Sequence, residues 1–266
     1  MRTSAAGPAS GSNPSVRGAL VLVHGYGEHA RRHVDLAEAA AANGCDVWAF
    51  DQAGHGESPG PRAVVNGYAA ACAAVVSLLD RATREQGRPP VLLGHSMGGA
   101  VALSVALEAP GKMRALALSS PFLLDPVPRP AALLAVARLA ARLAPGLPLV
   151  RPDDNLISRD PAEVRRYQSD PLNHHGGVPA VTGMTMRSAG AALLARAAAL
   201  AVPTLIIHGE SDGYADVAGS RALAAASPKV ELVTIPGGYH ELHHEPPHTG
   251  VPLRVRERFL DWLASA

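Results

Sequence analysis

A serine flanked by glycines follows an apolar run in the first half of the chain. Residues 91–93 lead into Gly94-His95-Ser96-Met97-Gly98-Gly99, and the helix-compatible stretch 100–108 comes next. A strand that turns sharply into a helix leaves little room around a serine at its tip, and neighbouring glycines relieve that crowding. The helix also directs its first amides at charge that develops near the serine. The pattern predicts that Ser96 is a nucleophile, against the alternative of a glycine-rich turn that happens to contain serine.

A serine hydroxyl is a weak nucleophile until a base takes its proton, and a carboxylate has to orient that base. Where a strand passes through such a serine into a helix, the expected chain order is serine, acid, histidine. The acid should follow the apolar run 204–208, and Asp212 lies just beyond it. Asp212 is therefore the predicted acid, with Glu210 and Asp216 as alternatives.

The base should follow the last apolar run, at residues 230–235. The turn Pro236-Gly237-Gly238 reverses the chain there and presents His240. His243 and His244 lie further from the strand end, and we expect them in a polar surface turn. His240 is therefore the predicted base.

Acyl transfer also needs two preorganised N–H groups to stabilise the oxyanion, each contributing about 2.7–4 kcal/mol. Met97 N–H, directly after the nucleophile, is expected to be one of them. Tyr26 N–H, between two glycines after the apolar run 19–23, is expected to be the other. Only the backbone of these two residues is required.

The predicted catalytic groups lie in a chain whose predicted strands and helices alternate regularly. Short apolar runs and helical stretches follow one another, as expected for a parallel sheet covered by helices on both faces. The predicted strands are 19–23, 46–50, 91–96, 115–119, 204–208 and 230–235, and the predicted helices are 32–42, 65–86, 100–108, 219–226 and 251–263. The sequence thus predicts an α/β fold with a mostly parallel sheet.

The alternation stops between residues 122 and about 200. This segment shows no strand pattern and contains the apolar helical stretch 131–143 and the polar stretch 153–170. It is too long for a plain loop. We expect a helical cap, inserted after the strand that ends near Ser119 and lying over the carboxyl end of the sheet.

Composition narrows the class of protein further. The 266 residues include 24 basic and 23 acidic ones, for a formal net charge of +1, which argues against a nucleic-acid-binding surface. No run approaches the roughly 18 apolar residues of a transmembrane helix. Residues 1–17 lack the apolar segment of a secretory signal, so we expect a disordered leader before one domain over 18–266. A cytoplasmic protein is expected, and its oligomeric state is left open.

Twelve histidines invite the question of a metal site. The pairs His174-His175 and His243-His244 are adjacent in sequence and lack a recognisable ligand spacing. We expect no metal.

Several longer motifs occur in a fixed order along the chain. They are His24-Gly25-Tyr26-Gly27-Glu28-His29, Asp51-x-x-Gly54-His55-Gly56-x-Ser58, the Ser96 motif, Asp170-Pro171-Leu172 and Gly238-Tyr239-His240. Together they resemble the monoacylglycerol lipases, within the lysophospholipase and serine-aminopeptidase-like group of α/β-hydrolases. The likeness is greatest to bacterial, actinobacterial-type members. It runs from about residue 18 to the C-terminus and includes the cap, where residues 155–160 and Tyr167-x-x-Asp170 also match.

The resemblance implies an α/β-hydrolase that releases a fatty acid from a monoacylglycerol, a small lipid ester, without a cofactor. It also implies that Glu28, Arg32 and Tyr167 shape the site around the glycerol group. Alternatively, Glu28 and Arg32 cap and charge-balance the first helix, and Tyr167 packs within the cap. Relatives usually carry a pair of strands before the one that reaches His24, so we expect this edge of the sheet to be truncated.

Two interpretations of the cap helix stay open. The stretch 131–143 is apolar around most of its circumference and is interrupted only by Arg138 and Arg142. Such a helix normally lies buried in a core. In a cap it could instead touch a membrane or lipid-droplet surface and wall an acyl channel, with the arginines at headgroup level.

Three alternative functions also stay open from the sequence. A broader carboxylesterase or lysophospholipase would use the same groups. A proline-type aminopeptidase would need acidic residues in the cap to hold a free amino terminus, and candidates for these are Asp153, Asp154, Asp160 and Glu163. A binding protein that uses the fold without chemistry is the alternative from a different class.

Overall fold

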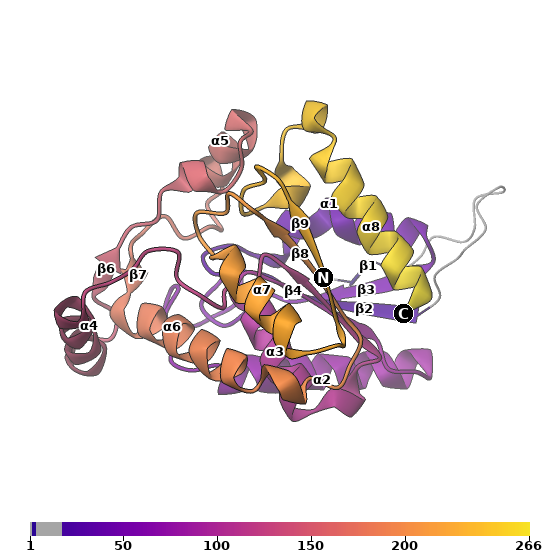
Figure 1. Ribbon diagram of the computed structural model, residues 1–266, viewed down its shortest axis with the longest axis horizontal. Helices are drawn as coiled ribbons and strands as arrows, with labels where there is room; N and C mark the ends of the chain where they lie inside the picture. The colour runs from indigo at the N-terminus through magenta and orange to yellow at the C-terminus, as the bar shows by residue number, and fades with distance from the viewer. Residues whose placement is uncertain (1, 4–17) are drawn as a thin grey trace.

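A seven-stranded sheet forms the centre of the computed structural model, which describes residues 2–3 and 18–266 (Figure 1). The strand order is β1-β3-β2-β4-β5-β8-β9, and all neighbours are parallel except β1 and β3. The strands are β1 Arg2–Thr3, β2 Gly18–Val23, β3 Cys45–Ala49, β4 Val91–His95, β5 Ala115–Ser119, β8 Thr204–Gly209 and β9 Val230–Ile235. The predicted mostly parallel α/β sheet is confirmed.

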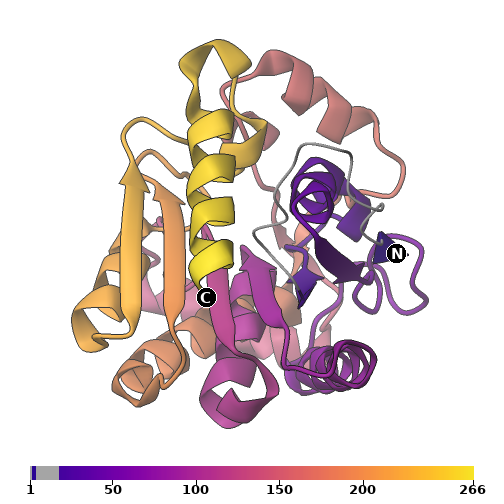
Figure 2. The ribbon, with the colours of Figure 1, turned by 90° about the vertical axis from the view of Figure 1, so that its right-hand side faces the viewer.

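Helices cover both faces of this sheet (Figures 1 and 2). The helices outside the cap are α1 Val34–Ala42, α2 Ala69–Gln86, α3 Met97–Glu108, α7 Val217–Ala226 and α8 Val251–Ser265. In β2, Val21 packs with α2 and α3, whereas its neighbours Leu20 and Leu22 pack with α1 and α8 on the other face. Successive strand side chains point to opposite faces, so a strand buried on both sides is apolar throughout.

The expected cap lies between β5 and β8. It contains α4 Ala131–Leu143, β6 Pro148–Val150, α5 Pro161–Ser169, β7 Val178–Pro179 and α6 Ala180–Ala195. Here α4 packs on α6, and α6 packs on α3 of the main body. The expectation of no strand in this segment is wrong, because β6 and β7 pair antiparallel. Each has two or three residues and includes a proline, which is too short for a period-2 pattern.

The β1 edge also differs from expectation. Most of the predicted leader lies outside the described residues, but Arg2–Thr3 forms β1 and pairs antiparallel with Trp48 and Val47 of β3. This edge therefore carries a short strand where the sequence predicts only a leader and a truncated sheet.

Among the helices in the described part of the chain, none is both long enough and apolar enough to cross a membrane.

Candidate active site

Ser96 lies at the tip of a strained turn between β4 and α3. Its backbone angles, φ 53° and ψ −119°, are rarely adopted by residues with a side chain. The turn is crowded on both sides: a Cβ on Gly94 would lie 2.7 Å from Gly99 Cα, and one on Gly98 would collide with the carbonyl oxygens of Val23 and His24. The glycines are therefore required by the close approach of α3 to β4 and to the end of β2, as the motif predicts.

Asp212 and His240 meet at the ends of β8 and β9. His240 Nδ1 lies 2.7 Å from Asp212 Oδ2. The second oxygen, Asp212 Oδ1, accepts hydrogen bonds from the amides of Tyr214 at 2.8 Å and Ala215 at 2.9 Å. His208 Nε2, 3.1 Å from Asp212 Oδ2, completes its surroundings.

The alternative acids take other contacts. Asp216 caps α7 by accepting a hydrogen bond from Ala218 N at 2.9 Å. Glu210 pairs with Arg221 at 3.0 Å in a partly exposed position. The geometry thus favours Asp212 as the acid.

The environment of this pair fixes its charges. Burial favours the neutral ring of His240, but the charge and hydrogen bond of Asp212 favour the protonated ring by more, so its pKa lies above 6.5. The same contact, opposed by burial, holds the pKa of Asp212 well below its usual range. Asp212 therefore stays ionised and holds the proton of His240 on Nδ1, which leaves Nε2 as the acceptor.

The loop after β2 brings the second expected oxyanion donor to the serine. Gly25 packs directly against the nucleophile, since a Cβ on it would lie 3.0 Å from Ser96 Cβ. Tyr26, the next residue, lines the same cavity as Ser96 and His240. Met97 begins α3, so its N–H is one of the free amides at that helix N-terminus.

A cavity of about 580 Å³ opens above these groups. Its floor is polar and includes Ser96, His240, Tyr167, Glu28 and Glu241. Its walls come from the cap and are mainly apolar, with contributions from Leu133, Leu134, Val136, Leu149, Val150, Val178, Met184 and Met186. An apolar channel that ends at a few polar groups suits a ligand with a long apolar part and a small polar end.

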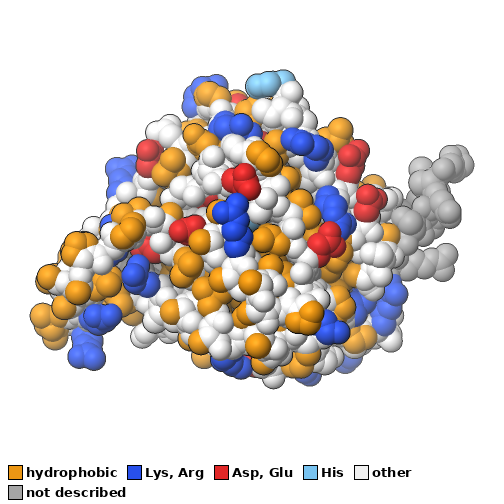
Figure 3. Space-filling view, viewed as in Figure 1, with side chains coloured by type: hydrophobic (Ala, Val, Ile, Leu, Met, Phe, Trp, Pro, Cys, Tyr) orange, Lys and Arg blue, Asp and Glu red, His pale blue; other side chains and the backbone are white. Residues whose placement is uncertain are grey.

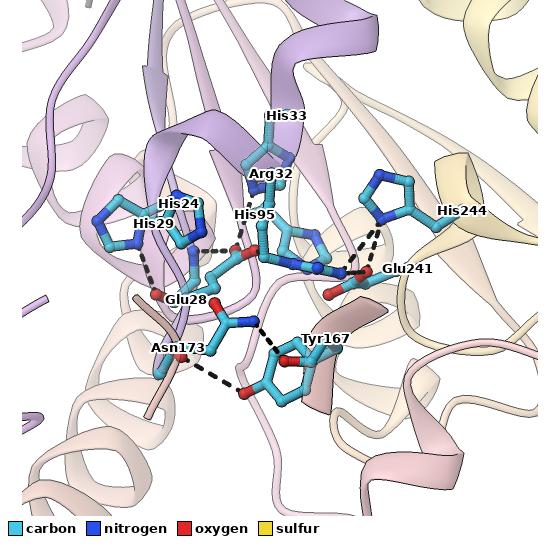
Figure 4. A network of polar contacts seen from close by, with 12 residues as sticks. His24, Glu28, His29, Arg32, His33, His95, Tyr167, Asn173, Glu241 and His244 are labelled. Atoms are coloured by element: carbon cyan, nitrogen blue, oxygen red, sulfur yellow. Dashed lines mark hydrogen bonds and ion pairs between the residues drawn. The ribbon is translucent and has the colours of Figure 1, made fainter. Parts of the chain in front are cut away.

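Glu28, Arg32 and Tyr167 belong to one buried polar network (Figure 4). Glu28 and Tyr167 line the cavity, whereas Arg32 lies behind its wall with its side chain 2% exposed. Arg32 Nε is 3.4 Å from Glu28 Oε2, and its guanidinium carbon lies 4.9 Å from the centre of the Tyr167 ring. This placement favours the charge-balancing interpretation of Arg32 over direct contact with a substrate.

The expectation of a polar surface turn at His243 and His244 is wrong. His244 is 4% exposed, and its Nδ1 lies 2.7 Å from Glu241 Oε2. The ring of His243 stacks on that of His33, with centroids 5.0 Å apart, and burial lowers its pKa well below 6.5. Sequence distance from a strand end does not reveal this burial, because the residues that contact these rings, His33 and Arg166 of the cap, come from other parts of the chain.

Sequence reasoning missed Glu241. It lines the cavity beside His240, is 3% exposed and contacts Arg32. The sequence does offer one signal for Glu241. It is a charged residue directly after the predicted base, in a loop that is otherwise rich in Gly, Pro and His. Among the described residues, no group of three or more His, Cys, Asp or Glu side chains is arranged to hold a metal ion.

Comparisons with known proteins agree with this geometry. The family model described as "Serine aminopeptidase, S33" matches residues 14–247. A "Monoacylglycerol lipase" of Mycolicibacterium smegmatis is 39% identical over 238 residues, covering 86% of this chain and 83% of the relative. The human "Monoglyceride lipase" is 35% identical, covering 86% of this chain and 77% of the relative.

A solved structure, the monoacylglycerol lipase of Paleococcus ferrophilus, superposes with a TM-score of 0.84 at 32% identity. The match covers 93% of this chain and 94% of that one. These matches confirm the resemblance predicted from the motifs. The chain therefore belongs to the serine aminopeptidase S33 family of α/β-hydrolases, in its monoacylglycerol lipase group.

Proposed function

We propose that this protein is a serine esterase that hydrolyses monoacylglycerols to a fatty acid and glycerol. The observation that carries this proposal is the cavity, in which an apolar channel from the cap ends at Ser96 and a polar floor. The channel suits one acyl chain, and the floor suits a small alcohol that carries hydroxyl groups. The names of the relatives point to the same substrate class.

The arrangement supports an acyl-enzyme mechanism. His240 Nε2 takes the proton of Ser96 Oγ as this oxygen attacks the ester carbonyl, and Asp212 stabilises the resulting imidazolium. The amides of Tyr26 and Met97 hold the oxyanion. His240 then gives its proton to the departing glycerol oxygen. A water molecule, activated by the same base, releases the fatty acid and regenerates Ser96.

The rival substrates receive less support. Of the four acidic residues that an aminopeptidase would use, Asp160 caps α5 and Glu163 pairs with Arg166 at 2.7 Å. Asp153 and Asp154 line the cavity, but the carboxylate of Asp153 accepts hydrogen bonds from Asn155. A broader carboxylesterase or lysophospholipase remains the second candidate, because it needs only the same triad and an apolar channel.

The cap also supports contact with a lipid surface. Within α4 no residue is buried, so the interpretation of this helix as part of a core is wrong. Exposed large apolar side chains gather on α4 and the following segment, including Val136 at 62%, Leu139 at 57% and Leu143 at 76% exposed. Figure 3 shows this part of the cap as a protrusion that mixes apolar and basic side chains.

Exposed apolar clusters of this kind mark interaction sites. We infer that this surface enters a membrane or lipid-droplet interface transiently, with Arg138 and Arg142 at headgroup level and the cavity opening beside it. The protein would then be peripheral at such surfaces.

A substrate panel on the purified protein and its Ser96→Ala variant tests the function. We expect the protein to prefer monoacylglycerols over diacylglycerols, triacylglycerols, a lysophospholipid and an aminoacyl amide. The variant should lose at least about 10³-fold in kcat, because the nucleophile is absent. Unchanged ester hydrolysis by Ser96→Ala would refute the mechanism, and a preference for the lysophospholipid or the amide would refute the substrate class.

A further inference from the structure

Two loops have to keep a fixed separation for the proposed reaction. The loop after β9, residues 236–247, carries His240, and the loop after β2, residues 24–29, carries the Tyr26 amide. Glu241, next to His240, reaches from the first loop towards the second. Its side chain is 4% exposed, and its Oε2 lies 2.5 Å from Arg32 Nη2.

Arg32 continues this connection to the loop after β2. Its Nε lies 3.4 Å from Glu28 Oε2, an ion pair without a hydrogen bond between these two atoms. Glu28 Oε1 in turn accepts a hydrogen bond from the amide of Gly25 at 2.5 Å, one residue before Tyr26. A continuous series of charged groups thus links the residue after His240 to the residue before the expected oxyanion donor (Figure 4).

His244 connects the same carboxylate to the cap. Its Nδ1 lies 2.7 Å from Glu241 Oε2, and its Nε2 lies 3.0 Å from Arg166 Nη2 on α5. A guanidinium only donates, so Nε2 accepts from Arg166 and Nδ1 is left to donate to Glu241. The backbone adds a further link, because Glu241 N donates to Ile157 O at 2.8 Å.

We propose that Glu241 is a positioning residue for His240, which through Arg32 and Glu28 sets the spacing between the base and the oxyanion loop. The proposal rests on the function proposed above, in which His240 is the base. Glu241 touches neither the reacting atoms nor His240 Nδ1, which Asp212 holds; it acts through the loop that it fastens.

Burial of the Glu241–Arg32 pair favours a positioning role over stabilisation alone. Taking a carboxylate and a guanidinium out of water costs several kcal/mol each, and well-packed apolar replacements of buried ion pairs are often as stable. A pair retained beside the base therefore suits a need for fixed geometry, which the directional contacts of a guanidinium supply.

The charge of Glu241 also acts on His240. The groups facing that ring are Asp212 at 2.7 Å and the rings of His95 and Tyr214, with centroids 4.9 and 5.1 Å away. Burial lowers the pKa of His95 to about 3 and raises that of Tyr214, so both are neutral at pH 7. The charges of Asp212, Glu241 and Glu28 raise the pKa of His240 against the effect of burial, so removing the charge of Glu241 should lower that pKa.

The test compares Glu241→Gln with the wild-type protein on a soluble short-chain ester. We expect kcat to fall about 10- to 100-fold with KM changed by less than about threefold, because misplacement by an ångström has costs of this order. The acid limb of the pH profile should move to lower pH. As a matched control, Glu57→Gln removes a carboxylate from an exposed pair with Arg31 at 2.9 Å. It should leave kcat, KM and the position of the acid limb unchanged.

A second variant covers the case in which Glu241→Gln does not fold. Glu241→Asp keeps the charge but cannot reach Arg32, so kcat should fall while the acid limb stays in place. Wild-type kcat in a folded Glu241→Gln protein, or in Glu241→Asp, would overturn the proposal. The Ser96→Ala variant separates this failure from failure of the proposed function. If Ser96→Ala abolishes hydrolysis in the same assay while a Glu241 variant keeps wild-type kcat, only the positioning role is refuted and the proposed function stands.

Discussion

The charge of each catalytic side chain depends on the buried groups that contact it. Asp212 has a hydrogen-bond donor or an ion-pair partner on both oxygens and stays charged in spite of burial. His240 can accept a proton at Nε2 because that carboxylate fixes its Nδ1. The charge of one residue is thus a property of the pair.

Asp212→Asn tests this dependence. We expect kcat/KM to fall by about 10⁴-fold, as the loss of this acid does in other serine hydrolases. The wild-type activity should fall as pH decreases through a pKa above 6.5, because only neutral His240 can act as a base. In the variant this midpoint should move to lower pH, since burial still lowers the pKa and the carboxylate no longer raises it.

The measurement is kcat/KM between pH 5 and pH 9. Asp216→Asn is the matched control, because asparagine also caps helices and the residue lies at the start of α7. A larger loss of kcat/KM from Asp216→Asn than from Asp212→Asn would show that Asp216, not Asp212, is the acid.

Elements approach one another closely at the turn between β4 and α3. Gly98 in the first turn of α3 lies against the carbonyl ends of β2, which leads directly into the loop that carries Tyr26. The helix can therefore hold the nucleophile and the oxyanion loop together only if this position has no side chain.

Gly98→Ala is expected to lower both stability and activity. Alanine is about 1 kcal/mol better than glycine within a helix, but here its Cβ would collide with backbone that cannot move aside. Overpacking of this kind costs about 1–3 kcal/mol, which corresponds to a Tm lower by roughly 2–12 °C.

Calorimetry and an ester assay would measure the two effects. Gly111→Ala is a suitable control, because a Cβ there meets open space and should leave the Tm and the activity near wild type. Equal Tm values for the two variants would contradict this account of the turn.

The whole molecule divides its tasks between the sheet and the cap. The sheet gathers the reactive groups at its carboxyl edge, and the cap walls the cavity and presents α4 to the surroundings (Figure 1). Leu134 and Val136 of α4 line the cavity, whereas Leu139 and Leu143 lie on α4 outside the set of residues that line it. Substitutions in the first pair would test binding of the acyl chain, and substitutions in the second pair would test contact with a lipid surface.

Replacing Leu139 and Leu143 together by glutamate is expected to lower activity on emulsified long-chain substrate by at least about tenfold, because two leucines no longer enter the interface. Activity on a soluble short-chain ester should stay within about twofold, since the catalytic groups are untouched. The control Leu253→Glu alters a residue of α8 that is 48% exposed. Equal losses on both substrates would exclude the surface contact.

The sequence by itself determined the six parallel strands of the sheet, their order along the chain and the predicted catalytic groups. Ser96, Asp212 and His240 each follow an apolar strand, and the carboxyl ends of parallel strands share one edge. Residues far apart in sequence therefore come together without knowledge of side-chain contacts. The glycines of the Ser96 turn are equally local signals.

Only the tertiary structure decided which polar side chains are buried and which apolar ones are not. Glu241 and His244 are buried where Arg32 and Arg166 of α5 contact them, and Arg32 becomes part of the wall rather than of the cavity lining. The helix α4 has core-like residues, yet it packs mainly on α6 and none of its residues is buried. Burial depends on what other segments cover, and neither periodicity nor spacing within one segment records that.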